Sequence, residues 1–462
     1  MEHVLPMPCS LAAFRSTGAC PYEYWPLEAR RLQPQAARTI TSMPSARRKH
    51  SRLARAAESS DARHPPGPAL LPFLGSVSVL WALIRKVPLA KVLSKLRARY
   101  GPIFMLKFGP MRQVWIGDLK LLQNIYDRED CSGRPAPWKD PFGGNFLFLV
   151  REPARAAELR PLQKQWIEEN VKEAAVKLTV DAALKDILWT ALDKEGPLAW
   201  PALEVRRAMY FAVIRALLGD CEVTEAELDD IMVATKEYSS GRRQRGRKRK
   251  SEAEPHPGAA TIRRIVSTVL ERAGRTDLDQ ALPLVVAASI GGAEILPGFI
   301  HWIMLYYAAH RAEQEDAAEA ALAFDSALLL SKLYAVLRRV PYSVAIGPPR
   351  RVMSDAEIGD MTLPSGAMLF AMHPAITDSA VGLQASTKAY DADFSEFAFG
   401  VGTRTCLGRT IAEAVLPAVA GGLLRRYRVS FGKSSDTMPE GDLQGQLMVP
   451  VKPPALRWEP RI

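Results

Sequence analysis

The sequence has few cysteines, and none of them lies in a pattern that binds zinc or builds a disulfide framework. The five are Cys9, Cys20, Cys131, Cys221 and Cys406, and no CxxC pair occurs. Isolated cysteines of this kind are typical of a reducing interior compartment. The sequence also lacks an uninterrupted run of eighteen apolar residues. A membrane-spanning helix usually needs such a run, so the sequence predicts no transmembrane anchor.

Acidic residues are absent from positions 29–57, which carry eight Arg or Lys residues with interspersed Ser and Thr. An Arg-rich, acid-poor leader is the composition of an organelle transit peptide, for a plastid or a mitochondrion. A basic disordered tail of a cytoplasmic protein has the same composition. Both interpretations of residues 1–63 stay open. The proline-rich segment from His64 to Pro68 then begins the folded domain, which we expect over residues 64–462.

The composition does not indicate a nucleic-acid partner, although the net charge is +11 over 462 residues. Much of the excess is local: residues 242–250 hold seven positive charges and no aromatic side chain that could stack on a base. This basic run is interpreted as a solvated loop, a contact with a membrane surface or acidic partner, or a nuclear signal. The hydrophobic content of 48% is enough for one large core or two ordinary ones.

A glycine-rich loop at residues 399–408 carries the most specific pattern: Phe399-x-x-Gly402-x-Arg404-x-Cys406-x-Gly408. Its glycines allow a tight turn and close approach of the backbone to a flat ligand. A helical pattern begins directly after the loop, so free N–H groups at the helix start can stabilise a Cys406 thiolate. Arg404 can pair with a carboxylate.

This loop resembles the haem-binding signature of the cytochrome P-450 superfamily. The resemblance implies a mainly α fold with a smaller β region, and haem b with Cys406 as the iron ligand. Phe399, Gly402 and Gly408 would then contact the cofactor. Arg404, together with Arg350 or Arg351, would pair with the haem propionates.

A continuous apolar segment from Leu278 to His310 predicts one long helix with Gly291 and Gly292 at its middle. Paired glycines in a helix favour a bulge or close approach. In the superfamily this helix crosses the haem, so the glycines would form the niche for bound oxygen or peroxide. Monooxygenase members carry an acid followed by Thr here, whereas this chain has Glu294 followed by Ile295. Ser289 is a candidate hydrogen-bond donor, and the alternative is a helix Ser that bonds its own backbone.

Three stretches are similar to the allene oxide synthase and hydroperoxide lyase family: Gly143-Gly144 with Glu152-Pro153, the helix residues Gly291 to Pro297, and His373-Pro374. The Asn that this family carries near its glycines is Ala288 here. Most P-450 proteins carry a Trp-x-x-x-Arg pattern in the helix that begins here at Pro153, and this chain lacks that pattern. Arg160 is the nearest substitute, although a solvated helix face is the interpretation we favour for it.

The favoured function is therefore rearrangement of a lipid hydroperoxide by homolytic O–O cleavage, without a reductase. The runner-up is a monooxygenase that uses O2 and an electron donor on a lipophilic substrate. The third is a haem-binding protein without turnover. Ala335 favours the third, because it replaces the Glu of the Glu-x-x-Arg motif, and so does the short segment between Gly219 and Gly291. The partners expected are a lipophilic small molecule, a redox protein only for the monooxygenase, and at most peripheral contact with a membrane.

Overall fold

The computed structural model describes most of the chain after residue 63. The described residues are 64–68, single positions between 76 and 87, and then 89–134, 146–148, 150–193, 197–219, 221–241, 257–337, 339–340, 347–372, 399–444 and 447–461. The leader, Gly143-Gly144, the basic run at 242–250 and His373-Pro374 lie outside them, and the hypotheses made on those residues stay predictions.

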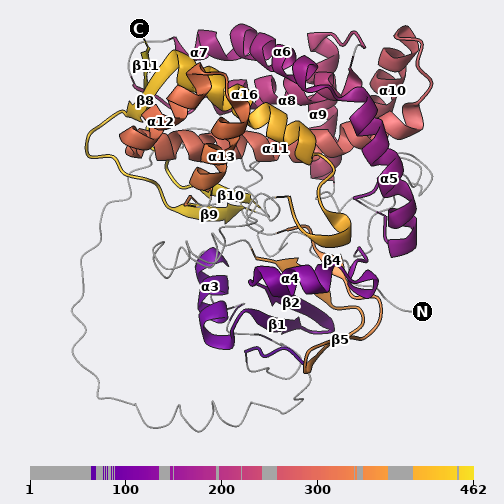
Figure 1. The fold of residues 1–462 in the computed structure, drawn as a ribbon. Helices are drawn as coiled ribbons and strands as arrows, with labels where there is room; N and C mark the ends of the chain where they lie inside the picture. The colour runs from indigo at the N-terminus through magenta and orange to yellow at the C-terminus, as the bar shows by residue number, and fades with distance from the viewer. Residues whose placement is uncertain are drawn as a thin grey trace, which may run out of the picture.

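Helices dominate the described residues and gather into one layer (Figure 1). The helices of this layer are α5 (Pro153–Asn170), α6 (Glu173–Ala183), α7 (Thr190–Leu192), α8 (Ala202–Leu218), α9 (Glu225–Gly241), α10 (Pro257–Arg272), α11 (Leu278–Ala309), α12 (Arg311–Leu322), α13 (Ser326–Leu337) and α16 (Arg409–Arg426). A π-helical segment, Leu184–Trp189, joins α6 to α7.

A smaller β region lies at the opposite side of the molecule, with α3 (Leu89–Tyr100) and α4 (Leu119–Tyr126) beside it (Figure 1). Its four-stranded sheet has the order β1-β2-β7-β4. The strands are β1 (Ile103–Phe108), β2 (Met111–Ile116), β7 (Met368–Ala371) and β4 (Arg350–Arg351). The β1–β2 hairpin turns at Gly109 and Pro110, and β2 runs parallel to β7.

The remaining strands form three small sheets. The strands β3 (Pro197–Leu198), β11 (Leu456–Pro460) and β8 (Tyr427–Phe431) make one of them. The other two are hairpins, β5 (Ala356–Ile358) with β6 (Met361–Leu363), and β9 (Gly441–Gln444) with β10 (Leu447–Pro450). The mainly α fold with a smaller β region is thus confirmed.

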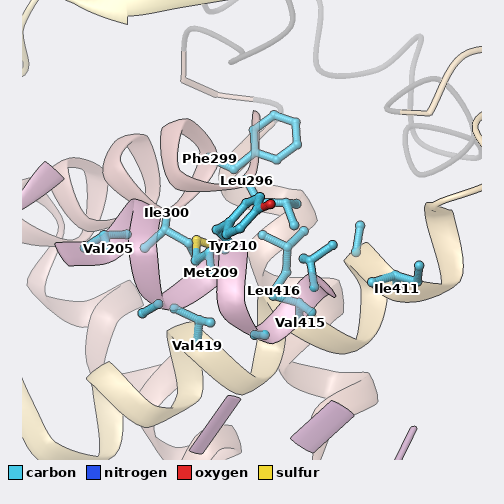
Figure 2. Close-up of a cluster of buried hydrophobic side chains, with 14 of the residues drawn as sticks. Val205, Met209, Tyr210, Leu296, Phe299, Ile300, Ile411, Val415, Leu416 and Val419 are labelled. Carbon is cyan, nitrogen blue, oxygen red and sulfur yellow. The ribbon is translucent and has the colours of Figure 1, made fainter. Parts of the chain in front are cut away.

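The core is built where α8, α11 and α16 meet. Figure 2 shows Tyr210 of α8 packed among Leu296 and Phe299 of α11 and Leu416 of α16. Tyr210 is 1% exposed, because it lies among the buried, mostly apolar residues of α8 between Val205 and Leu218. This packing fixes how α11 is rotated, and therefore which of its residues face away from the core.

Helix α11 is long and apolar enough to span a membrane by length and composition, but 62% of its most apolar window is buried inside the protein. It is placed as the central helix of the fold. It remains α-helical through Gly291, Gly292 and Pro297. The expected bulge at the glycine pair is therefore wrong: because α8 and α16 hold α11 in place, the regular helix continues across it.

Ala335 lies on the exposed side of α13. Next to it, Tyr334 is 8% exposed and donates a 2.9 Å hydrogen bond to Oε1 of Glu413 on α16. Glu413 also accepts a 3.0 Å hydrogen bond from Nε of Arg409. A polar link between α13 and the helix after the cysteine loop is therefore present without a Glu at position 335.

Candidate functional site

The loop before α16 is held by hydrogen bonds between its own residues. The N–H of Cys406 donates to the carbonyl oxygen of Phe399 at 2.8 Å, and the Thr405 hydroxyl donates to the carbonyl oxygen of Gly402 at 2.6 Å. Gly400 and Gly402 have φ values of +77° and +73°, which L side chains rarely adopt. These contacts hold Cys406 at the end of the loop, close to the start of α16. Gly408, two residues further on, is the N-cap of that helix.

A cavity of about 350 Å³ lies between this loop and α11. The loop contributes Phe399, Gly400, Val401 and Arg404 to Gly408 to its lining, α11 contributes residues between Pro283 and Phe299, and α5 contributes Arg160, Gln163 and Ile167. The lining also includes Leu122 and Tyr126 of α4, Arg134, residues 146–148, Val213 and Leu217 of α8, and Arg350 of β4. Its volume is in the range of small-molecule and cofactor sites.

The side chain of Cys406 is exposed to this cavity, whereas Cys131 and Cys221 are buried elsewhere in the described core. Enclosure by the surrounding protein raises the pKa of the Cys406 thiol. The backbone N–H of Gly408 and the charge of Arg160 act in the opposite direction. A bound metal cation would add a much larger stabilisation of the thiolate.

Two arginines named from the sequence, Arg350 and Arg404, line the cavity. Arg350 is 3% exposed and donates hydrogen bonds of 2.7 Å to the carbonyl oxygens of Tyr126 and Val401. Arg404 donates to the carbonyl oxygens of Leu147 and Val150 at 3.1 Å. Burial lowers the pKa of each guanidinium to about 10, so both remain charged at neutral pH.

Two further arginines, Arg134 and Arg160, also line the cavity. Burial lowers the pKa of Arg134 to about 10 and also lowers the pKa of Arg160. Arg160 is half-buried, so the favoured interpretation of a solvated helix face is wrong. No sequence signal marks Arg134. It reaches the site because its neighbour Gly133 bridges to Arg351, the residue after Arg350.

The wall formed by α11 is apolar. It presents Ala287, Ala288, Gly291, Ile295 and Leu296 to the cavity. A Cβ on Gly291 would meet no atom within 4 Å, whereas one on Gly292 would lie 3.3 Å from Cγ1 of Val213. The niche predicted at these glycines thus exists through missing side chains and not through a bulge. The side chain of Glu294 is outside the described residues, so its role stays a prediction.

Ser289 does not serve the cavity. It is 2% exposed, and its hydroxyl donates to the carbonyl oxygen of Val285 at 2.7 Å and lies 3.3 Å from the hydroxyl of Tyr210. The structure contradicts its expected role as a donor to a bound peroxide, because the packing of α8 on α11 turns it into the core. The alternative, a Ser that bonds its own helix, is confirmed.

Gly402 also lies outside the cavity lining, although Phe399 and Gly408 belong to it. A Cβ at Gly402 would lie 2.3 Å from the carbonyl oxygen of Tyr126. Its close approach is therefore to the end of α4. The expected cofactor contact of Gly402 stays a prediction.

The residues around the cavity fit a haem. Arg134, Arg350 and Arg404 hydrogen-bond only to neutral oxygens, and within the described part of the chain none of them pairs with a carboxylate. Buried cations without an anion are costly, so this cavity favours an anionic ligand. The thiol of Cys406 supplies the soft sulfur donor that iron accepts. Haem, with two carboxylates and one iron, meets both demands.

Comparisons with known proteins agree with this geometry. The family model described as "Cytochrome P450" matches residues 65–245. The chain is 23% identical to "Cytochrome P450 76M5" of Oryza sativa subsp. japonica over 445 residues, which cover 81% of this chain and 87% of that protein. It is also 23% identical to "Cytochrome P450 monooxygenase aclC" of Aspergillus oryzae, over 39% of this chain and 41% of that protein.

The fold is that of a solved zebra fish cytochrome P450 with abiraterone, at a TM-score of 0.64 and 17% identity, over 81% of this chain and 99% of that chain. The resemblance to the allene oxide synthase and hydroperoxide lyase family has no support among these relatives. Family match, relatives, fold and cysteine loop together support the cytochrome P450 superfamily for this chain, and that superfamily binds haem b through a cysteine thiolate.

Proposed function

We propose that this cytochrome P450 uses a lipid hydroperoxide as its oxygen source and rearranges it without a reductase. One observation carries the proposal. Of the described residues of α11 that face the cavity, every side chain is apolar or absent. Activation of O2 requires protons to reach the distal oxygen, and a hydrocarbon wall cannot deliver them.

The same wall suits the substrate class. The lining includes Phe146, Phe148, Leu217, Leu284 and Phe299, so a long hydrocarbon chain would be bound by burial of apolar surface. Gly291 leaves open space on the side of α11 that lines the cavity. A hydroperoxide group at the end of such a chain would fit that space.

Haem, when bound, supplies an iron centre that can cleave an O–O bond. The protein's own residues hold and shield it. Cys406 would give the thiolate ligand, Arg350 and Arg404 would neutralise cofactor carboxylates, and the α11 wall would exclude water from a radical that forms beside it. None of these roles consumes electrons from a partner protein.

A monooxygenase is the second candidate. The name of the Aspergillus oryzae relative contains this activity, and the chain carries Glu294 two residues after Gly292. In that case a ferredoxin or flavoprotein would supply electrons. The decisive difference between the two candidates is whether a proton donor reaches the oxygen bound over the haem.

The test introduces a hydroxyl on the cavity wall. Leu296→Thr adds a hydroxyl that can relay protons. Leu296→Val is the control, because valine has nearly the same shape as threonine but lacks the hydroxyl. Turnover is measured with a fatty-acid hydroperoxide alone, and separately with O2, NADPH and a reductase on a lipid. We expect the wild type and Leu296→Val to work only with the hydroperoxide, and Leu296→Thr to gain NADPH-driven turnover. An efficient NADPH-driven reaction in the wild type, unchanged by Thr, would favour the monooxygenase.

A further inference from the structure

Three arginines meet one glutamate at the end of the molecule that carries the C-terminal strand. Nε of Arg311 lies 2.8 Å from Oε1 of Glu315, both in α12, and Nε of Arg428 in β8 lies 3.3 Å from the same oxygen. Nη1 of Arg461, which follows β11, lies 2.5 Å from Oε2. Figure 1 shows α12, β8 and β11 gathered at this end of the helical layer. We propose that this arginine cluster binds a phosphate group.

The arginine cluster lies apart from the cavity beside Cys406, because none of its four residues belongs to the cavity lining. The proposal therefore holds whichever oxygen source the enzyme uses.

The cluster holds more positive charge than it neutralises. Burial acts to raise the pKa of Glu315, but the hydrogen bond from Arg461 and the charges of the three arginines outweigh it, so this pKa lies below its usual value. Glu315 is therefore ionised at neutral pH, and its single negative charge faces three positive ones. Guanidinium groups held this close repel one another unless an anion is added. The cluster is thus prepared for a ligand with about two negative charges.

The other charges on this face do not remove the excess. Glu459 is the cross-strand neighbour of Arg428, but in the part of the chain that the structure describes no ion pair joins them. Arg457 is exposed, two residues before Glu459 in the same strand, and offsets its charge.

Each arginine of the cluster keeps N–H groups that have no acceptor. Arg311 and Arg428 contact Glu315 through Nε, and their Nη groups have no acceptor among the described residues. These two side chains are 56% and 46% exposed, so an anion can reach them from solvent. Arg461 is only 11% exposed: its Nε donates to the carbonyl oxygen of Tyr427 at 3.1 Å, and its Nη2 has no partner. Arg461 is thus fixed by the fold beneath two accessible guanidinium groups.

This arrangement favours phosphate over other anions. A guanidinium donates two parallel hydrogen bonds to phosphate oxygens, and arginine clusters recognise phosphorylated groups for this reason. A phosphate monoester carries about two negative charges near pH 7, which matches the excess, whereas a carboxylate carries one. The group can belong to a free phosphate compound or to a phospholipid headgroup, and the test separates these two sources.

The first arm titrates the full-length holoprotein with inorganic phosphate by isothermal calorimetry, in chloride of matched ionic strength. Arg311→Gln and Arg428→Gln change exposed side chains, so both variants should fold. Each should weaken phosphate binding about tenfold. Arg457→Gln is the matched control, because this exposed arginine of β11 makes no ion pair with Glu315 in the described structure, and it should bind phosphate as the wild type does.

Glu315→Gln separates a binding site from a purely structural ion-pair cluster. The substitution keeps the shape of the side chain and removes the negative charge that competes with the ligand. Phosphate binding should become about tenfold tighter, and phosphate should restore stability to urea that chloride does not. A structural cluster predicts the opposite pattern: a less stable variant that phosphate and chloride affect equally.

The second arm follows co-sedimentation with phosphatidylcholine vesicles, with and without phosphatidic acid. If the phosphate belongs to a lipid, the wild type and Arg457→Gln should sediment only with phosphatidic acid, while Arg311→Gln and Arg428→Gln stay in solution. Selective loss in either arm supports the site. The proposal is overturned if the wild type binds neither inorganic phosphate nor phosphatidic acid, if Arg311→Gln and Arg428→Gln bind as the wild type does, or if Arg457→Gln weakens binding equally.

Discussion

The backbone of Gly402 lies against the carbonyl oxygen of Tyr126, so closely that a Cβ at position 402 would be 2.3 Å from that oxygen. The same carbonyl accepts a 2.7 Å hydrogen bond from Nη1 of Arg350. The end of α4 is therefore the point at which the cysteine loop and strand β4 are joined. The position of Cys406 depends on this junction, because Gly402 and Cys406 belong to one tight loop.

Gly402→Ala should destabilise the fold and the haem site together. An alanine side chain is unfavourable at a φ of +73°, and the new methyl group also overlaps with the backbone of Tyr126. Gly109→Ala is the matched control, with a φ of +56° and no atom within 4 Å of its Cβ. Urea unfolding should show Gly402→Ala to be less stable than Gly109→Ala by about 1–3 kcal/mol, the usual range for overpacking. Equal losses would mean that the contact with Tyr126 is relaxed in solution.

Cys406→Ser should abolish the thiolate-ligated Soret band of the reduced, CO-bound protein. Cys406 is the described cysteine that lines the cavity, so no neighbouring sulfur can replace it. Cys221→Ala removes a buried thiol outside that lining and should keep the band. A normal spectrum for Cys406→Ser would show that another residue ligates the iron.

Substitutions at the glycine pair should separate helix stability from cavity space. Gly291→Ala should stabilise the protein by up to about 1 kcal/mol, because Ala favours a helix and its Cβ meets nothing. Gly292→Ala should gain less, since its Cβ would lie 3.3 Å from Val213. Gly291→Leu should leave the fold intact but lower turnover with any oxidant. Full activity of Gly291→Leu would show that the niche lies elsewhere.

Because His301 is buried, we expect the free energy of unfolding to fall in acid. His301 is 6% exposed and stacks on Trp200 with ring centroids 4.6 Å apart, and its Nε2 has no hydrogen-bond partner among the described residues. Burial lowers its pKa from 6.5 to about 3. Between pH 6.5 and about 3, the imidazole of His301 takes up a proton in the unfolded chain but not in the folded protein. Stability should therefore fall by up to about 1.4 kcal/mol per pH unit from pH 6.5 downwards, ending near pH 3.

Urea unfolding at pH 7, 6 and 5 measures this slope. His301→Phe should flatten it, because a phenyl ring can stack on Trp200 and cannot be protonated. An unchanged slope in His301→Phe would assign the acid sensitivity to other groups.

The parts of the site that the sequence predicts are local in the chain. The loop from Phe399 to Gly408 and the extent of α11 follow from glycine positions and apolar patterns that neighbouring residues share. The parts that it does not predict depend on distant contacts. Ser289 faces the core because Tyr210 packs on α11, and no local pattern records that rotation.

The basic residues of the cavity show the same limit. Arg134 reaches the cavity because the N–H of Arg351 donates a 2.7 Å hydrogen bond to the carbonyl oxygen of Gly133, across more than two hundred residues of chain. Arg160 lies there because α5 packs along the helical layer, although its own helix has almost no amphipathic pattern. A single sequence without such periodicity gives no reason to prefer the cavity over solvent for either arginine.

The proposal that a hydroperoxide is the oxygen source is tested most directly by turnover without oxygen. Purified full-length protein is given a fatty-acid hydroperoxide under anaerobic conditions, with no NADPH and no reductase, and product formed per haem is counted. Because the α11 wall offers no proton relay among its described residues, we predict many turnovers per haem and a rate at least about a hundredfold above the NADPH-driven rate in air. The account is contradicted if the hydroperoxide only bleaches the haem and product forms solely with O2, NADPH and a reductase.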